Sequence, residues 1–262
     1  MLLQTFLNLH IQVAVLILAA MVLLYILSLL LKNSSIVDCF WGAGFVLIAW
    51  YVFSLTGAPH APRDWLMVGL VTIWGLRLTA YVTWRNWGKG EDFRYTKWRN
   101  EHPDQWWWRS FFHVFILQGL IMWVVASPIT GVLAAENSTS LALLDYLGIF
   151  VWVIGFLFES VGDIQLARFR ANPDNKGQVL NKGVWHLTRH PNYFGDAAQW
   201  WGFYVIALSA GAWWTVISPL WMTYLLVKVS GVAMLERTLN YKPGYEAYAA
   251  KTSAFIPWFP KK

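Results

Sequence analysis

Long apolar stretches recur along almost the whole chain and are separated by short polar segments. Neither an internal repeat nor a broken helix of the transporter type is visible, and no polar linker divides the sequence into halves. The pattern predicts an all-α integral membrane protein of about seven transmembrane helices, built as a single domain over residues 1–262. The predicted spans are residues 9–31, 36–56, 65–84, 111–134, 143–163, 195–211 and 213–233.

The composition supports a membrane protein, because 57% of the residues are hydrophobic and only 13% are charged. Soluble domains carry about 25% charged residues. The first lysine, Lys32, follows the first apolar stretch, so the basic region that opens a secretory signal peptide is missing and we expect that stretch to remain as a span. We expect a monomer in a bacterial inner membrane, or in the endoplasmic reticulum of a eukaryotic cell.

The lysines and arginines fall almost entirely on one side of the predicted spans. Seven lie between spans one and two and between three and four, and ten more lie between five and six and after span seven. The opposite side has only Arg63. Because basic loops stay in the cytoplasm, the N-terminus is expected outside and the C-terminus inside. Basic residues of this kind contact membrane lipids, and no nucleic-acid partner is expected.

Four acidic residues lie near the cytoplasmic ends of predicted spans: Asp38, Asp163, Asp196 and Glu236. Ionisable groups are costly to bury in a bilayer, so each needs a partner or a function. At one common depth they are candidates to line a polar cavity that opens inward, although paired or snorkelling helix ends are the alternative. Arg77 lies deeper, within the third span, and is expected to pair with an acid or a phosphate.

A polar corner precedes the sixth span and runs from Arg189 to Asp196 as Arg-His-Pro-Asn-Tyr-Phe-Gly-Asp. Its proline stops a preceding helix, its glycine lets backbone approach a ligand, and its polar side chains offer donors and acceptors. Arginine also presents a planar fork that suits phosphate. The corner and its cations therefore predict a nucleotide site, unless they serve topology alone. The cations are Arg168, Arg170, Lys176, Lys182 and Arg189.

A second polar run extends from Arg85 to Tyr95 and contains Lys89 between two glycines. Glu91, Asp92 and Tyr95 are candidate proton donors or acceptors there, and a solvated charged loop is the competing interpretation. The sequence has no His-Glu-x-x-His motif and no Cys/His cluster with metal spacing, so no metal is expected.

With these motifs the chain resembles the steroid 5-alpha-reductase family, in its bacterial membrane branch. The resemblance begins at about Ile36 and is most specific over residues 38–44, 77–95 and 189–196, and in the tail from Ser230 to Pro257. It implies a seven-span reductase that uses NADPH to reduce the activated double bond of a 3-oxo-4-ene steroid or a similar enone lipid. NADPH would enter from the cytoplasm and bind mainly residues 159–262.

The resemblance also assigns cofactor contacts. Asp163 and Arg170 match residues that hold the adenosine and phosphate part, and Asn192 and Asp196 match residues nearer the nicotinamide. Glu159 stands where the family has Asn. The full predicted cofactor set is Arg77, Lys89, Asp163, Arg168, Arg170, Lys182, Arg189, His190, Asn192, Tyr193, Asp196, Glu236 and Tyr248.

The predicted catalytic residues depart from the family pattern. Eukaryotic members pair a Glu of the second span with a Tyr of the third to polarise the steroid carbonyl, whereas this chain has Asp38 and Trp74 at those positions. We expect a rebuilt pair, Asp38 with Tyr95 or Glu91, and we expect apolar surroundings to keep Asp38 protonated so that it can donate.

The main alternative is a membrane methyltransferase that binds S-adenosylmethionine, like the isoprenylcysteine carboxyl methyltransferases, which share the Arg-His-Pro-x-Tyr corner. The Asn after Pro191, the acid four residues later and the Gly-Lys-Gly-Glu-Asp run favour the reductase. A transporter or a sterol-binding protein is a third possibility, and the lack of visible repeats speaks against the transporter.

Overall fold

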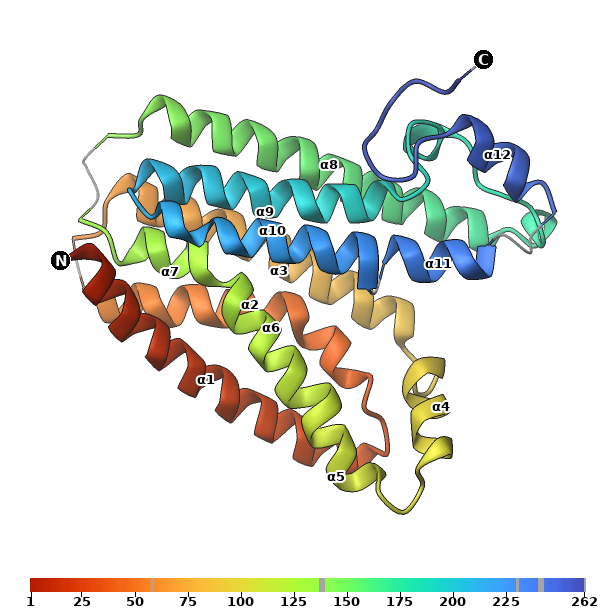
Figure 1. Ribbon diagram of the computed structural model, residues 1–262, viewed down its shortest axis with the longest axis horizontal. Helices are drawn as coiled ribbons and strands as arrows, with labels where there is room; N and C mark the ends of the chain where they lie inside the picture. The colour runs from red at the N-terminus through yellow and green to blue at the C-terminus, as the bar shows by residue number, and fades with distance from the viewer. Residues whose placement is uncertain (58, 137–139, 230, 240–242, 262) are drawn as a thin grey trace. The chain divides into compact units, whose positions relative to one another are not determined.

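A computed structural model describes residues 1–57, 59–136, 140–229, 231–239 and 243–261, and these residues form helices and loops without a β-strand (Figure 1). Contacts divide the chain into two compact units. The first unit contains Met1–Leu141 and Ala207–Thr215, and the second contains Ala142–Ile206 and Val216–Lys262. Ser230 of the predicted tail motif lies outside the described residues, as do the counted cations Lys242 and Lys262. The single domain expected from the sequence stays a prediction.

The first unit is built mainly from the amino-terminal helices. Its elements are α1 (Leu2–Leu31), α2 (Ile36–Thr56), α3 (Pro62–Asn86), α4 (Phe93–Glu101), α5 (Trp106–Ser110), the π-helical turn η1 (Phe111–Ile116), α6 (Leu117–Val125) and α7 (Ser127–Leu133). The last three residues of α9 and most of the 3₁₀ turn η4 (Trp213–Val216) also belong to it.

The second unit contains the two long helices α8 and α9 and the carboxy-terminal helices. Its elements are α8 (Leu143–Ala171), the 3₁₀ turns η2 (Pro173–Asn175) and η3 (Gly183–His186), α9 (Pro191–Ser209), α10 (Ile217–Tyr224), the π-helical turn η5 (Leu225–Val229), α11 (Val232–Leu239) and α12 (Tyr245–Lys251).

Six segments of the described chain are long and apolar enough to cross a membrane, which makes this a multi-pass membrane protein by length and composition. The sixth predicted span falls in α9, which has 19 residues but carries Asn192, Asp196 and Gln199 in its first half and is not among the six. The orientation of the termini stays a prediction. The six segments are Leu2–Leu31, Ile36–Thr56, Pro62–Asn86, Trp106–Val125, Leu143–Ala171 and Trp213–Arg237.

The predicted fourth span, residues 111–134, is wrong in its bounds. The membrane-length segment begins earlier, at Trp106, and ends at Val125. A separate short helix, α7, follows Ala126 and carries Pro128 in its first turn. Proline lacks a backbone N–H and fits the start of a helix better than its interior, so it starts a new helix here.

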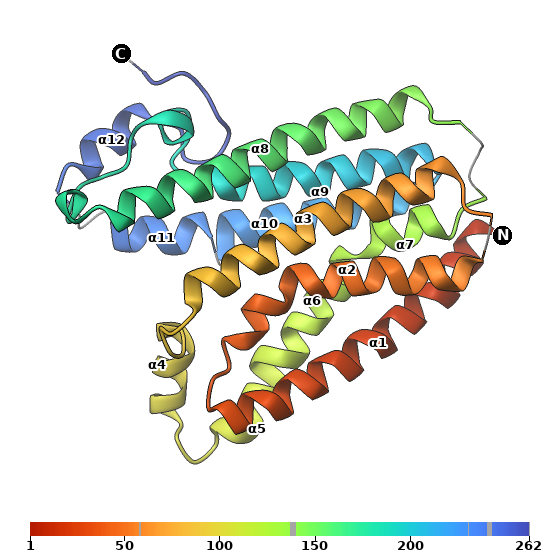
Figure 2. The same cartoon turned by 180° about the vertical axis from the view of Figure 1, so that it is seen from behind.

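Helices α2 and α3 lie side by side and touch through their backbones (Figure 2). A Cβ atom on Gly42 would lie 2.1 Å from the carbonyl oxygen of Gly75, and one on Gly75 would lie 2.5 Å from that of Gly42. Only glycine permits so close an approach. This contact fixes the first turns of α2, where Asp38 lies, against α3.

Helices α8 and α9 pack through glycines spaced seven residues apart, a separation that returns to the same helix face after two turns. A Cβ on Gly155 would lie 2.5 Å from the carbonyl oxygen of Gly195, and one on Gly148 would lie 2.9 Å from that of Gly202. Gly162 continues the row and faces Pro191. The row therefore sets which side chains of the two helices face each other.

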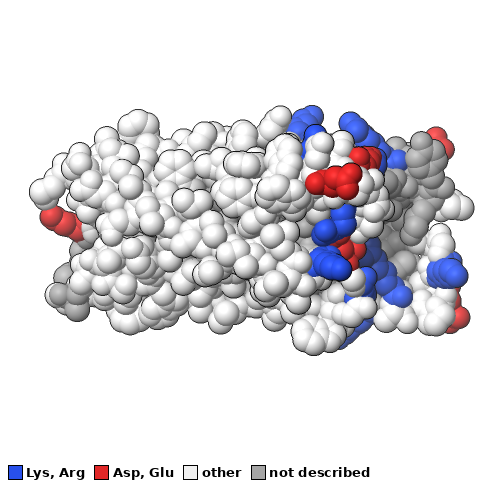
Figure 3. Space-filling model, turned by 90° about the horizontal axis from the view of Figure 1, so that it is seen from below, with Lys and Arg blue, Asp and Glu red and all other residues white. Residues whose placement is uncertain are grey.

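Charged side chains are unevenly distributed on the face drawn in Figure 3. Most of that face is apolar, and its Lys, Arg, Asp and Glu side chains gather toward one end. An apolar surface of this kind suits contact with lipid, and charged side chains suit contact with water.

Candidate functional site

Two loops of the first unit are joined by hydrogen bonds, and their junction builds the first candidate site. The backbone N–H of Ser34, before α2, donates to Glu91 Oε1 at 2.6 Å. The N–H of Asp92, before α4, donates to the Ser35 hydroxyl at 3.1 Å. Asp92 also caps α4 by accepting from the N–H of Arg94 at 2.9 Å. These contacts hold the start of α4 beside the start of α2.

Asp38, Arg94 and Tyr95 meet at this junction, and we call them the acid–arginine–tyrosine cluster. Tyr95 Oη donates to Asp38 Oδ1 at 2.8 Å, and Arg94 Nη2 donates to Asp38 Oδ2 at 2.8 Å. Arg94 Nε also donates to Asp92 at 2.9 Å. The Tyr95 residue is 4% exposed, whereas the side chains of Asp38 and Arg94 are 20% and 31% exposed. The cluster therefore has a buried side and an accessible side.

The accessible side presents one free donor. Arg94 uses Nε and Nη2 for its bonds to Asp92 and Asp38, and its side chain makes no other hydrogen bond with the described residues. Its Nη1 makes none and is not among the buried nitrogens. A guanidinium nitrogen with free N–H groups is an efficient donor to an oxygen of a ligand.

On its buried side, the cluster continues into a chain of hydrogen bonds. Trp41 Nε1 donates to Gln118 Oε1 at 2.5 Å, and Gln118 Nε2 donates to Tyr95 Oη at 3.0 Å. Gln118 lies in the first turn of α6, directly after the π-helical turn η1. A π-helical turn contains an extra residue and shifts the phase of the helix that follows it. The shift helps set the direction in which Gln118 points.

The pKa values of Tyr95 and Arg94 keep each of these two groups in one charge state. Burial raises the pKa of Tyr95 well above its usual value, and the charge of Asp38 raises it further, so the phenol stays protonated. Burial alone would lower the pKa of Arg94, but the carboxyl groups of Asp92 and Asp38 outweigh it and raise that pKa. Arginine is thus charged at any accessible pH.

Glu91 lies beside the cluster in a separate ion pair. Its carboxylate accepts two hydrogen bonds from Arg99, at 2.9 and 2.8 Å, in addition to the bond from Ser34. Burial alone would raise the pKa of Glu91, but these donors lower it below its usual value. The structure therefore brings Asp38 into contact with Tyr95, whereas Glu91 forms hydrogen bonds with Ser34, Arg99 and Thr96.

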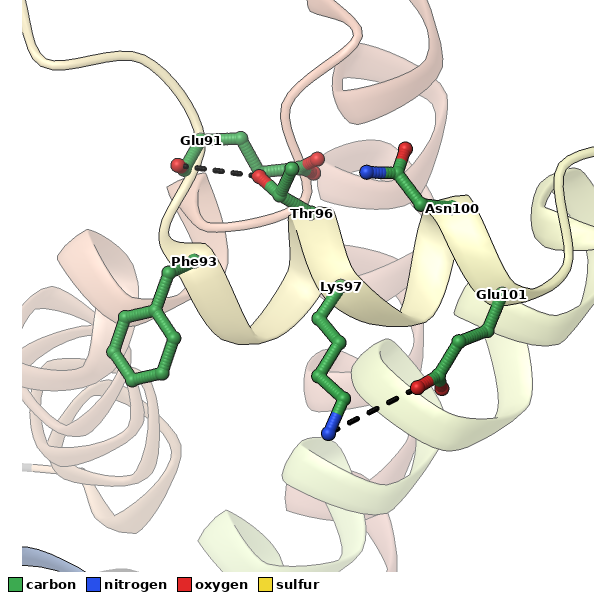
Figure 4. A pocket seen from close by; sticks show the side chains of 6 residues that line it. All are labelled: Glu91, Phe93, Thr96, Lys97, Asn100 and Glu101. Carbon is green, nitrogen blue, oxygen red and sulfur yellow. Dashed lines mark hydrogen bonds and ion pairs between the residues drawn. The ribbon is translucent and has the colours of Figure 1, made fainter. Parts of the chain in front are cut away.

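A shallow depression opens on α4 next to Glu91 (Figure 4). Lys97 and Glu101 point to one side of the helix and pair at 3.9 Å, while Glu91, Thr96 and Asn100 lie on another side. Its lining is open and of mixed charge, so we assign no ligand to it.

In the second unit, Arg189 forms the centre of a closed network. Its Nε and Nη2 donate to Glu236 at 2.9 and 3.1 Å, and its Nη1 donates to the carbonyl oxygens of Ala249 and Thr252 at 2.8 and 2.7 Å. All three nitrogens are used, and the side chain is 12% exposed. Arg189 ties the start of α9 to α11 and α12.

Other predicted cofactor residues complete this network. His190 Nε2 lies 2.9 Å from Glu236 Oε1, and burial lowers the pKa of His190 despite that contact. Tyr245 donates to the same carboxylate at 2.7 Å. Tyr248 donates to the carbonyl oxygen of Trp185. The polar groups of Arg189, His190, Glu236 and Tyr248 are therefore occupied with one another and with backbone.

The facing turns of α8 and α9 carry further predicted residues. Asn192 Nδ2 donates to Asp163 Oδ1 at 3.3 Å, which brings together the two residues expected at opposite parts of the cofactor. About one turn before Asp163 on α8 and two turns after Asn192 on α9, Gln199 donates to the buried Glu159 at 2.7 Å. The ring of Tyr193 stacks on that of His190 at 5.7 Å.

Three predicted phosphate-binding cations of the second unit are exposed. Arg168, Arg170 and Lys182 lie at the end of α8 and in the loop after it. None of them makes an ion pair or hydrogen bond with the described part of the chain. In the first unit, Lys89 is exposed in the loop before α4, and the guanidinium group of Arg77 lies 5.5 Å from the ring centre of Tyr81.

Sequence reasoning missed Arg94, Gln118 and Trp41. Arg94 appeared only as one of many cytoplasmic cations, and Gln118 and Trp41 lie inside apolar stretches. A glutamine in a membrane span was the one usable signal, because polar groups in lipid need partners. Within the described residues, no group of three or more His, Cys, Asp or Glu side chains is placed to hold a metal ion.

The helical fold and its six membrane-length segments define the class as a multi-pass membrane protein. The chain belongs to the family described as "Protein of unknown function (DUF1295)", whose model matches residues 24–252. An uncharacterized protein of the fission yeast Schizosaccharomyces pombe is 27% identical over 257 residues, which cover 86% of this chain and 73% of the relative. No solved structure matches the chain.

Proposed function

We propose that the chain is an oxidoreductase that uses NADPH to reduce the carbon–carbon double bond of an enone lipid, such as a 3-oxo-4-ene steroid. The hydrogen bond of 2.8 Å between Asp38 and Tyr95 carries the proposal. The resemblance to the steroid 5-alpha-reductases implies a carboxyl group of the second span and a tyrosine that together hold the substrate carbonyl. Here the carboxyl group is in α2, and α4 supplies the tyrosine that the third span lacks.

The position that matches the family tyrosine is filled by a packed side chain. Trp74 is 1% exposed, and its ring lies 5.6 Å from that of Phe45 in the core of the first unit. An indole there has no hydroxyl to offer and no access to a ligand. Tyr95, from a different element, is therefore the tyrosine that stands beside the carboxyl group of Asp38.

A groove along α3 suits a lipid substrate. It is mainly apolar, and it belongs to a membrane-length segment, so an apolar molecule could enter it from the bilayer. The groove reaches α2, because a Cβ on Gly42 would lie 2.7 Å from the Thr79 hydroxyl. Asp38 is one helical turn, about 6 Å, from Gly42. The lining residues are Leu76, Thr79, Ala80, Thr83, Trp84 and Trp87.

The second unit offers groups that fit NADPH. The unpaired, exposed cations Arg168, Arg170 and Lys182 suit its phosphates, because charged donors without an internal partner lose little on binding an anion. Asp163 and Asn192, which already pair at 3.3 Å, offer acceptors and donors for its sugar and amide groups. When bound, NADPH supplies a hydride and is oxidised to NADP⁺.

The reduction needs two additions to the substrate. The β carbon of the enone gains a hydride, the electron pair of the double bond moves toward the carbonyl oxygen, and the α carbon then gains a proton from water. Negative charge on the oxygen must be stabilised during this change, and fixed donors in a dry site do so most effectively. The acid–arginine–tyrosine cluster supplies such donors at the start of α2 and α4.

The proposal is tested first by nucleotide binding to the detergent-purified protein, comparing NADPH, NADH and S-adenosylmethionine by calorimetry. We expect tight binding of NADPH, weakened about 10-fold or more in Arg170→Ala and in Asn192→Ala, since a hydrogen bond to a charged group contributes about 1.5–3 kcal/mol. Lys97→Ala removes a cation from α4 and should bind NADPH normally. A preference for S-adenosylmethionine would replace the reductase with a methyltransferase.

Turnover is the second test. Vesicles that contain the protein and NADPH should convert a 3-oxo-4-ene steroid to its saturated ketone, measured by mass spectrometry. Tyr95→Phe should lower kcat about 10²-fold, the usual loss when a group that supports developing charge is removed. If no enone in a broad lipid panel consumes NADPH, the proposal fails.

A further inference from the structure

We propose that Arg94 is the catalytic residue that meets the substrate carbonyl, through its free Nη1, and that Asp38, Tyr95, Gln118 and Trp41 are positioning residues that hold it. This inference rests on the proposed function and replaces the expectation that a protonated Asp38 donates to the carbonyl.

The argument starts with the direction of the hydrogen bonds. Trp41 is a donor only, so the atom of Gln118 that faces it at 2.5 Å must be the amide oxygen. The amide nitrogen of Gln118 then faces Tyr95 and donates to its hydroxyl oxygen at 3.0 Å. The orientation of an amide is normally ambiguous, but a donor-only partner removes the ambiguity here.

The hydroxyl proton of Tyr95 has one remaining partner. Since the hydroxyl oxygen accepts from Gln118, the proton points to Asp38 Oδ1, which lies 2.8 Å away. Arginine also donates only, so Asp38 Oδ2 accepts from Arg94 at 2.8 Å. Both oxygens of Asp38 are therefore acceptors. Two donors, one of them charged, favour the carboxylate form of Asp38 over the acid form that would give a proton to a ketone.

The same reasoning excludes Tyr95 as the direct donor. Its proton is committed to Asp38, and the residue is 4% exposed. Turning the hydroxyl toward a substrate would leave Asp38 with an unpaired oxygen on its buried side, which is costly. Arg94 has none of these restrictions, because its Nη1 is unbonded and accessible.

The two carboxylates make Arg94 a better catalyst than a mobile arginine. Asp38 and Asp92 accept hydrogen bonds from its Nη2 and Nε, so the plane of the guanidinium group is fixed before a ligand binds. Preorganised donors stabilise developing charge without paying for their own rotation. The guanidinium group also retains a full positive charge, since arginine does not deprotonate in proteins.

The first measurement is the carbonyl stretch of a bound saturated 3-ketosteroid that carries ¹³C at the carbonyl carbon. This probe has the carbonyl oxygen of the substrate but lacks the carbon–carbon double bond, so it is not reduced there. Binding to the wild-type protein should shift the stretch to lower wavenumber. The shift should be lost in Arg94→Ala and in Arg94→Gln, and kept in Lys97→Ala, which removes an exposed cation from the same helix.

The second measurement is chemical rescue of turnover. Arg94→Ala should lower kcat about 10²–10³-fold, and added guanidinium chloride should restore part of it, while sodium chloride at equal ionic strength should not. The assignment of Arg94 is overturned if the bound ketone has the same carbonyl stretch in Arg94→Ala as in the wild type but loses its shift in Asp38→Asn. That outcome would leave the proposed function standing. Failure of the wild-type protein to bind the ketone at all would overturn it together with the proposed function.

Discussion

The two units each contain an arginine, a carboxylate and a tyrosine in mutual contact, yet the two assemblies differ in one respect. Arg189 uses all three of its guanidinium nitrogens on Glu236 and on backbone carbonyl oxygens. Arg94 keeps Nη1 free and accessible. The same residue types therefore serve two purposes: a saturated arginine fastens chain segments together, whereas an unsaturated one can bind a ligand.

The largest expected effect is on the saturated assembly. Arg189→Ala should destabilise the protein by about 3–5 kcal/mol, because it leaves Glu236 partly buried without its cation and leaves two carbonyl oxygens without donors. Chemical unfolding in detergent, followed by circular dichroism, measures the loss. Arg168→Ala is the control, since that arginine is exposed and unpaired, and it should unfold like the wild type. Equal stability of the two variants would contradict the fastening role of Arg189.

The two tyrosines give the sharpest comparison. Tyr95 donates to Asp38 at 2.8 Å and Tyr245 donates to Glu236 at 2.7 Å, and both residues are buried. Each change to phenylalanine removes one hydrogen bond to a carboxylate and should cost about 1.5–3 kcal/mol of stability. Only Tyr95→Phe should also lower kcat. Comparable kcat losses in both variants, measured in the steroid assay, would erase the distinction between the two assemblies.

A smaller, pH-dependent effect is expected from Glu91. Its pKa is lowered in the folded protein, so its contribution is present above the usual value of 4.5 and is lost as the pH falls through the lower, folded value. The melting temperature should therefore drop on acidification. Glu91→Gln should be less stable by about 1–2 kcal/mol near neutral pH. Its melting temperature should also fall less steeply as the pH is lowered. If the melting temperature of Glu91→Gln falls on acidification as steeply as that of the wild type, the ion pair of Glu91 is not the cause of the acid sensitivity.

The smallest effect should come from Lys97→Ala. The pair with Glu101 spans 3.9 Å, one helical turn apart, and its two side chains are 71% and 49% exposed. Such surface pairs contribute about 0.5 kcal/mol or less. The melting temperature should stay within error of the wild type, which is why this variant serves as the control above. A clear destabilisation would mean that α4 is held by its surface charges rather than by its buried residues.

The sequence was sufficient for the membrane helices and for part of the site. The length of the apolar stretches predicted α1, α2, α3 and α8. An acidic residue at the end of a predicted span made Asp38 a candidate. Contact between Asp38 and Tyr95 was one of two pairings open at that point, because residue spacing alone does not say how the loop before α4 folds back. The hydrogen bonds from Ser34 and Ser35 decide it.

The rest depended on side-chain geometry that no sequence pattern records. Arg94 and Arg189 are both arginines beside polar runs on the side predicted to be cytoplasmic, and only the number of satisfied nitrogens separates them. Pro128 was visible, but its effect on the fourth span required knowing that a new helix starts there. Gln118 was hidden because its direction depends on a local departure from regular helix geometry.

That departure has a consequence for how the protein can change. In a regular α-helix each residue rotates the chain by about 100°, so Gln118 would turn away from Tyr95 if Phe111–Ile116 became ordinary helix without losing a residue. The lipid-facing composition would hardly alter, and the chain would still insert in the membrane. Substitutions that make this turn regular are thus expected to keep the fold and break the hydrogen bond between Gln118 and Tyr95.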